Sequence, residues 1–186
     1  IAHGAGLATH MDGARLMNAV VASGAGAAQH AAGYDSVWID FTKGLGAPVG
    51  AVLAGSRGFI EEAWRLKQQM GGAMRQSGVI AAMCSFALDH NVERLAEDHE
   101  LARNLAVRLA DLPNIASITR PQTNLIFMDI AQEGPTAAAV VEFCRQRGVQ
   151  IGAFGARRIR LVTHLDVGPA DLDPLYAALA AGLHQS

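Results

Sequence analysis

The order of strand-like and helix-like segments constrains the fold of this chain more than any other feature. Residues 6–11 form a short apolar run, and residues 13–24 carry apolar side chains at helical spacing before a glycine. Residues 34–41 first alternate between polar and apolar side chains and then become continuously apolar, as in a buried strand. Residues 49–55 form another apolar run of this kind. Strand, helix and strand in this order predict an α/β fold with a mainly parallel sheet covered on its faces.

A long helical stretch follows an amphipathic helix predicted over residues 57–70. Residues 79–112 keep helical periodicity without a proline, which predicts one long helix or two with a break near residues 89–95. The pattern then restarts with alternating strands and helices over residues 123–130, 135–148, 159–165 and 169–183. We therefore predict a larger domain over residues 1–110, which includes the connecting helix, and a smaller α+β domain over residues 111–186.

Composition and charge exclude several classes of protein. The formal net charge is −2, from 15 basic and 17 acidic residues, and neither sign is concentrated, so we expect neither a nucleic-acid surface nor a basic membrane patch. No apolar run has the length of a membrane span, and no signal peptide is recognised. Cys84 and Cys144 lie in helix-like segments and are expected to be buried free thiols. These features predict a cytoplasmic protein.

The first residues have the pattern expected at the end of a structural unit. The chain opens with IAHGAG, without a methionine, and a glycine stop leads directly into a strand. We therefore expect a C-terminal fragment of a longer protein.

Lys43 stands where a buried strand is predicted to end, and it precedes the glycine-rich residues 44–48. A lysine removed from water favours its neutral amine, which can attack an aldehyde and form an imine. The tract is not a phosphate-binding P-loop, because the lysine comes before the glycines. The alternative is a solvated loop lysine.

Asp12 is predicted at the end of a neighbouring strand. Ligands of open α/β sheets bind outside the carboxyl ends of the strands, and Asp12 and Lys43 both lie at such ends. Pyridoxal phosphate needs this pair, because the lysine binds it covalently and a carboxylate keeps its ring nitrogen protonated. The alternative for Asp12, which can hold together with the first, is a helix N-cap.

Two further polar residues lie close to Asp12 in the sequence. Arg15 follows by three residues, about one helical turn, so its guanidinium could grip a carboxylate or steady the ring hydroxyl of the cofactor. A solvated surface arginine is the alternative. His10 precedes Asp12 by two residues, and strand alternation sends both side chains to the same face.

Several tracts in the same order resemble one enzyme family. HMDGARLMNA, DSVWIDFTKGLGAPVGAVLAGS, RLKQQMGGAMRQSGVIAA and RLVTHLDV together look like the low-specificity threonine aldolases. These enzymes belong to the aromatic amino acid β-eliminating lyase/threonine aldolase family of fold-type-I pyridoxal phosphate enzymes. The resemblance implies part of an aminotransferase-like large domain, a smaller C-terminal domain and a homo-oligomer, either dimer or tetramer.

The resemblance also implies roles for particular residues. Lys43 matches the lysine that binds the cofactor, and Asp12 matches the carboxylate paired with the ring nitrogen. Arg15 matches an arginine near the cofactor and the substrate carboxylate, and Arg75 one near the cofactor phosphate. Arg160 matches the small-domain arginine that grips the substrate carboxylate. Such a carboxylate would also satisfy a charged side chain in an otherwise apolar strand.

The activity that the resemblance implies is cleavage of threonine or allo-threonine into glycine and acetaldehyde. The alternatives are a β-eliminating lyase or another fold-type-I enzyme, and a non-catalytic fragment. In the family, the phosphate-binding loop, a ring-stacking group and the histidines proposed for proton transfer precede the HMDGAR tract. We therefore expect the isolated chain to be inactive.

The remaining polar residues have structural interpretations. Arg157 and Arg158 are predicted on an edge strand with their charges in solvent, and His164 as a hydrogen-bonded structural histidine. His99 is predicted on a charged helical face, either solvated or as a local ion-pair partner. No spacing of histidines, cysteines or acids indicates a metal site.

Overall fold

The computed structural model describes residues 1–184 and divides the chain into two compact units, Ile1–Leu95 and Ala96–Ser186. This division lies before the predicted domain boundary at residue 110. The difference arises because helix α5, Leu95–Leu109, contributes Leu105 and Leu109 to the core of the second unit. These and the other buried apolar side chains of α5 hold the helix to the residues that follow it.

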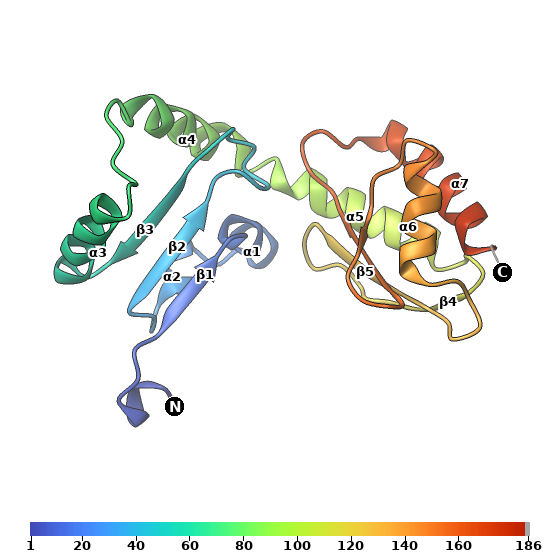
Figure 1. The fold of residues 1–186 in the computed structure, drawn as a ribbon, viewed down its shortest axis with the longest axis horizontal. Coiled ribbons are helices and arrows are strands. Elements are labelled where there is room, and N and C mark those ends of the chain that lie inside the picture. Colours follow the sequence, from blue (N-terminus) through green and yellow to red (C-terminus); the bar gives the residue numbers. More distant parts are fainter. Residues whose placement is uncertain (185–186) are drawn as a thin grey trace. The chain divides into compact units, whose positions relative to one another are not determined.

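The sheet of the first unit has three strands in the order β1-β2-β3 (Figure 1). Strand β1, His10–Gly13, pairs in parallel with β2, Ser36–Asp40. Strand β3, Ala51–Gly55, pairs with β2 in the antiparallel direction. The prediction of a mainly parallel sheet is therefore wrong. A parallel neighbour needs a crossover connection, and the short loop between β2 and β3 contains no helix.

Helices complete the first unit. Between β1 and β2 lie α1, Leu16–Ser23, and the short α2, Ala27–Ala31. Helix α3, Arg57–Gln69, begins at Ser56, whose hydroxyl accepts a hydrogen bond from the backbone N–H of Phe59. Helix α4 covers Gly78–Asn91 and ends before α5 begins, so the second of the two alternatives for residues 79–112 is confirmed.

The core of the first unit lies beneath the loop that carries Lys43. Phe41, Leu45 and Ala47 are all buried, and they pack with residues of α4 and with Leu95. Apolar side chains on both sides of Lys43 thus fix the loop to the unit. Because the loop is held in this way, the position of the Lys43 backbone is set by packing.

The second unit is an antiparallel sheet packed against helices. Its strand order is β4-β5-β7-β6, and the strands cover Ile115–Ile118, Leu125–Ile130, Arg158–Val162 and Gly152–Ala153. The helices are α5, α6 over Ala137–Arg145 and α7 over Leu172–Leu183, with a short 3₁₀ helix over Pro169–Asp171. A second 3₁₀ helix, His3–Ala5, belongs to the first unit. Ile126, Met128 and Ile159 are fully buried, so alternate residues of β5 and β7 form the core.

Candidate active site

One face of the first sheet collects polar side chains. Asp12 on β1 stands directly opposite Trp38 on β2 in the parallel pairing, and Asp40 follows Trp38 by two residues. Opposite residues of neighbouring strands, and residues two apart in one strand, point to the same face. Asp12, Trp38 and Asp40 therefore share a face, and Ile39 points to the core on the other side.

Lys43 reaches the same face from the loop after β2. Its Nζ lies 5.2 Å from the centre of the Trp38 ring and 2.5 Å from Oδ2 of Asp40. The cation thus contacts both an aromatic face and a carboxylate. Because Trp38 is opposite Asp12, the sheet brings the predicted lysine and carboxylate to one face. Their roles toward a cofactor stay predictions.

The surroundings of Lys43 differ from those that its sequence predicts. Its side chain is 37% exposed, and it forms an ion pair with Asp40. The expected desolvated amine is therefore wrong in this structure. The flanking glycines and apolar residues bury the loop backbone, whereas the long lysine stem carries its charge out to the polar face.

Asp40 is the residue at this site that sequence reasoning missed. Its Oδ1 accepts hydrogen bonds from the backbone N–H of Thr42 at 2.7 Å and from the Thr42 hydroxyl at 2.6 Å, and Oδ2 accepts from Lys43. Partial burial by itself would raise the pKa of Asp40, but these hydrogen bonds outweigh it and lower the pKa. The signal in the sequence that could have identified Asp40 is an acidic residue three positions before the lysine.

Asp12 has a local role that differs from the alternative offered for it. Its Oδ1 accepts a hydrogen bond from the backbone N–H of Ala14 at 3.0 Å, which stabilises the turn after β1. Helix α1 begins later, and its N-cap residue is Arg15. Asp12 is therefore not the N-cap of that helix, and its carboxylate remains exposed.

Arg15 lies next to this group of residues. It is half-buried at the start of α1, and it lines a small cavity together with Asn18, Asp40 and Gly44. The alternative of a fully solvated surface arginine is therefore wrong. The shared cavity places Arg15 beside the acid that binds Lys43.

The two remaining predicted arginines lie elsewhere in the chain. Arg75 is exposed in the turn ahead of α4. Arg160 belongs to the second unit, where it stands on the exposed face of β7, opposite Phe127, with its guanidinium 5.6 Å from the centre of the Phe154 ring. It lines a cavity of about 480 Å³ together with His164. The roles of Arg75 and Arg160 stay predictions.

The other charged residues of the second unit correct two expectations. Strand β7 lies between β5 and β6, so it is not an edge strand. Arg157 donates hydrogen bonds to the carbonyl oxygens of Ala131 at 2.8 Å and Gly134 at 2.7 Å, and Arg158 forms an ion pair with Asp129. Both guanidinium groups therefore have protein partners, although the Arg158 side chain is still 48% exposed.

The predictions for two histidines of the second unit have different outcomes. His99 is 2% exposed, and burial lowers its pKa, so the predicted solvated position is wrong. It precedes fully buried Ala102 by about one helical turn, which places both on the same side of α5. His164 Nδ1 accepts a hydrogen bond from the backbone N–H of Asp166 at 3.3 Å, as expected of a structural histidine.

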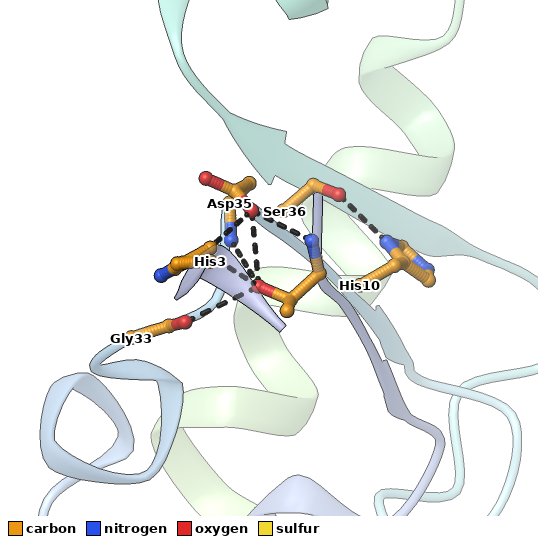
Figure 2. A network of polar contacts seen from close by, with 6 residues as sticks. His3, His10, Gly33, Asp35 and Ser36 are labelled. Carbon is orange, nitrogen blue, oxygen red and sulfur yellow. Dashed lines mark hydrogen bonds and ion pairs between the residues drawn. The ribbon is translucent and has the colours of Figure 1, made fainter. Parts of the chain in front are cut away.

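A polar network ties the N-terminal residues to the start of β2 (Figure 2). The carboxylate of Asp35 accepts hydrogen bonds from the backbone N–H of Thr9 at 2.6 Å and from its hydroxyl at 3.0 Å, and Nε2 of His3 lies 3.0 Å away. The backbone bond from Thr9 is the largest cause that lowers the pKa of Asp35 to about 2. Nδ1 of His10 lies 2.8 Å from the Ser36 hydroxyl.

Three other sequence features can be compared with residues 1–184. Cys84 and Cys144 are buried and free, as predicted. No helix in this part of the chain has both the length and the apolar character needed to cross a membrane. Within the same residues, no three side chains of His, Cys, Asp or Glu gather in a way that would hold a metal ion.

Comparisons with known proteins point to one family. A model of the family described as beta-eliminating lyase matches residues 1–133. The low specificity L-threonine aldolase of Escherichia coli O157:H7 is 44% identical over 166 residues, which cover 89% of this chain and 48% of that protein. The low-specificity L-threonine aldolase 1 of Arabidopsis thaliana is 38% identical over 170 residues, or 90% of this chain and 47% of that protein.

A solved structure shares the fold. The crystal structure from Exiguobacterium sp. 255-15 described as of the aromatic amino acid beta-eliminating lyase/threonine aldolase type aligns with a TM-score of 0.76 and 24% identity. The alignment covers 97% of this chain and 54% of that one. The chain thus spans about half the length of the curated relatives it matches.

Proposed function

Because the chain belongs to the beta-eliminating lyase family, we propose that it forms part of a pyridoxal-phosphate-dependent lyase. The proposed reaction cleaves threonine or allo-threonine into glycine and acetaldehyde. Identity to threonine aldolases supports the substrate class. The observation that carries the proposal is that Asp12 and Lys43 reach one face of the sheet, where both neighbour Trp38.

The residues on this face fit the cofactor chemically. Lys43 carries an amine that is accessible to an aldehyde, and the exposed carboxylate of Asp12 lies on the same face. When bound, pyridoxal phosphate supplies a ring that accepts the electron pair left at Cα. Lys43 would hold its aldehyde carbon, Asp12 would keep the ring nitrogen protonated, and Arg75 would bind its phosphate.

Substrate orientation is the proposed work of two arginines. A guanidinium binds a carboxylate through two parallel hydrogen bonds, which fixes the direction of the group as well as its position. We propose that Arg160, on the exposed face of β7 and beside a cavity, holds the substrate carboxylate, and that Arg15 assists. Fixing the carboxylate orients the Cα–Cβ bond that is to be broken.

A second reaction is favoured by the family match itself. The matching family is described as beta-eliminating lyase, and β-elimination would use the same lysine and carboxylate. The third reading is a non-catalytic role, which fits a chain that spans about half of its relatives. We propose that the complete protein is a cytoplasmic homo-oligomer, dimer or tetramer, and that the 186 residues are inactive by themselves.

The test uses a complete protein that contains this chain. Pyridoxal phosphate should give an imine absorbance band that Lys43→Ala abolishes and Lys67→Ala keeps. Acetaldehyde released from threonine supports the aldolase, whereas pyruvate released from a β-substituted amino acid supports the β-eliminating lyase. A cofactor band that survives in Lys43→Ala contradicts the proposed role of the lysine.

A further inference from the structure

The two lysines of the chain, Lys43 in the loop after β2 and Lys67 on α3, each lie over the ring of a tryptophan. Nζ of Lys43 lies 5.2 Å from the centre of the Trp38 ring, and Nζ of Lys67 lies 5.0 Å from the centre of the Trp64 ring. Lys43 also binds Asp40, whereas no carboxylate among residues 1–184 forms an ion pair with Lys67. Lys67 therefore serves as the reference for a lysine over an indole ring without a bound carboxylate, and variants of Asp40 show what that carboxylate adds.

The carboxylate of Asp40 is held in a fixed orientation. One oxygen, Oδ1, accepts both hydrogen bonds from Thr42, and the other, Oδ2, accepts from Lys43. Its side chain is only 10% exposed at the end of β2. Each oxygen thus has its own partner, and the bonds to Thr42 keep Oδ2 directed at the lysine.

The charge state of Asp40 decides how it can act on Lys43. Hydrogen bonds outweigh partial burial and lower the pKa of Asp40, so its carboxylate is ionised near neutral pH and is a weak proton acceptor. It therefore attracts the ammonium of Lys43 and does not remove its proton. The other charged groups nearby are Asp12, on the same sheet face, and Arg15, which shares a cavity with Asp40.

We propose that Asp40 is a positioning residue for Lys43, and that it holds the amine as an ammonium ion over Trp38 whenever the amine is not joined to an aldehyde. As a statement about the reaction, this rests on the proposed function. When the amino group of a substrate takes the place of Lys43 on the cofactor, Asp40 keeps the released amine beside the site. The lysine then returns without searching through solvent.

The test measures the reactivity of both lysines with a small aldehyde. The 186-residue chain is treated with formaldehyde and cyanoborohydride, and methylation of Lys43 and Lys67 is followed by peptide mass spectrometry. Only a neutral amine attacks the aldehyde, and a carboxylate partner disfavours that form. In the unchanged chain, Lys43 should react about threefold to tenfold more slowly than Lys67.

Variants of Asp40 separate charge from local structure. In Asp40→Asn, which keeps the size, the Lys43 rate should rise about threefold to tenfold. Asp40→Ser can still accept the backbone hydrogen bond from Thr42 and should act in the same direction. Asp40→Glu restores the charge and should return the ratio toward that of the unchanged chain. Circular dichroism and denaturant unfolding of each variant report whether the chain remains folded, and the rate at Lys67 is the internal reference.

Two results would overturn the proposal. The first is that Lys43 reacts as fast as Lys67, or faster, in the unchanged chain, and this measurement requires no variant. The other is an unchanged ratio in a folded Asp40→Asn or Asp40→Ser chain. Neither measurement uses pyridoxal phosphate, so they stand apart from the proposed function. A Lys43 rate in the unchanged chain that is equal to or faster than the Lys67 rate defeats the role of Asp40 alone, and a cofactor band that survives in Lys43→Ala defeats only the proposed role of the lysine toward the cofactor.

Discussion

Trp38 on β2 is the direct neighbour of Asp12 on β1 in the parallel pairing of the two strands. The ammonium of Lys43 lies over the indole of Trp38, 5.2 Å from the ring centre. A single aromatic side chain thus lies between the residues that are proposed to hold the two ends of a cofactor ring system. Its fluorescence can report whether a ligand binds on this face.

We expect pyridoxal phosphate to quench the fluorescence of Trp38 in the complete protein. The cofactor absorbs near the emission of tryptophan, and the Lys43 amine lies against this indole. Quenching should be largely lost in Trp38→Phe and kept in Trp64→Phe, since Trp64 lies on α3 beside Lys67. Equal quenching in the two variants would contradict a cofactor beside Trp38.

Acid should weaken the attachment of the N-terminal residues to β2. Hydrogen bonds from Thr9 lower the pKa of Asp35 from an ordinary 3.8 to about 2, so its ionised form favours the folded state. This contribution is complete above pH 3.8 and disappears as the pH falls toward 2. Denaturant unfolding of the unchanged chain and of Asp35→Asn should therefore differ most above pH 4 and converge near pH 2.

The control for this prediction is Asp89→Asn. It removes an exposed carboxylate of α4 without touching the hydrogen bonds of Thr9. A difference between the unchanged chain and Asp35→Asn that stays constant from pH 5 to pH 2 would count against the network.

Gly50, at the end of the Lys43 loop, should not tolerate a side chain. Its φ is +137°, and an added Cβ would lie 2.4 Å from Sγ of Cys84. Gly50→Ala should lower the free energy of unfolding by about 1–3 kcal/mol. Gly58→Ala on α3 meets nothing within 4 Å and should be neutral or stabilising by about 0.5 kcal/mol. Thermal denaturation of both variants checks the contrast, and equal stabilities would refute it.

The core of the second unit predicts a contrast within one helix. Leu105 is 1% exposed and Val107 is 73% exposed, and both lie on α5. Leu105→Ala leaves a cavity and should lower the free energy of unfolding by about 2–5 kcal/mol. Val107→Ala should change it by less than about 0.5 kcal/mol. Hydrogen exchange of the β5 amides measures the free energy of unfolding of both variants. A decrease in Val107→Ala as large as that in Leu105→Ala would refute this packing.

Local chemistry made several elements of both units predictable. Alternating and periodic apolar residues indicated β2, β5, α3 and α6, and the absence of metal-like spacing or charge blocks narrowed the possible functions. The short α2 and the two-residue β6 were missed because such elements carry too few residues to show a period. The N-cap alternative for Asp12 was wrong, because α1 begins later with Arg15 as its N-cap, whereas Ser56 and Thr136 accept backbone hydrogen bonds at the starts of α3 and α6.

By itself, the sequence determined the candidate lysine and carboxylate, the family resemblance and the two buried thiols, since these depend on residue identity and short spacings. Only the tertiary structure decided the antiparallel direction of β3, the burial of His99, the carbonyl contacts of Arg157 and the pairing of Asp40 with Lys43. These depend on which segments meet in space. Strand direction follows from the path of a loop, and the charge environment of a side chain follows from neighbours that the spacing of residues does not reveal.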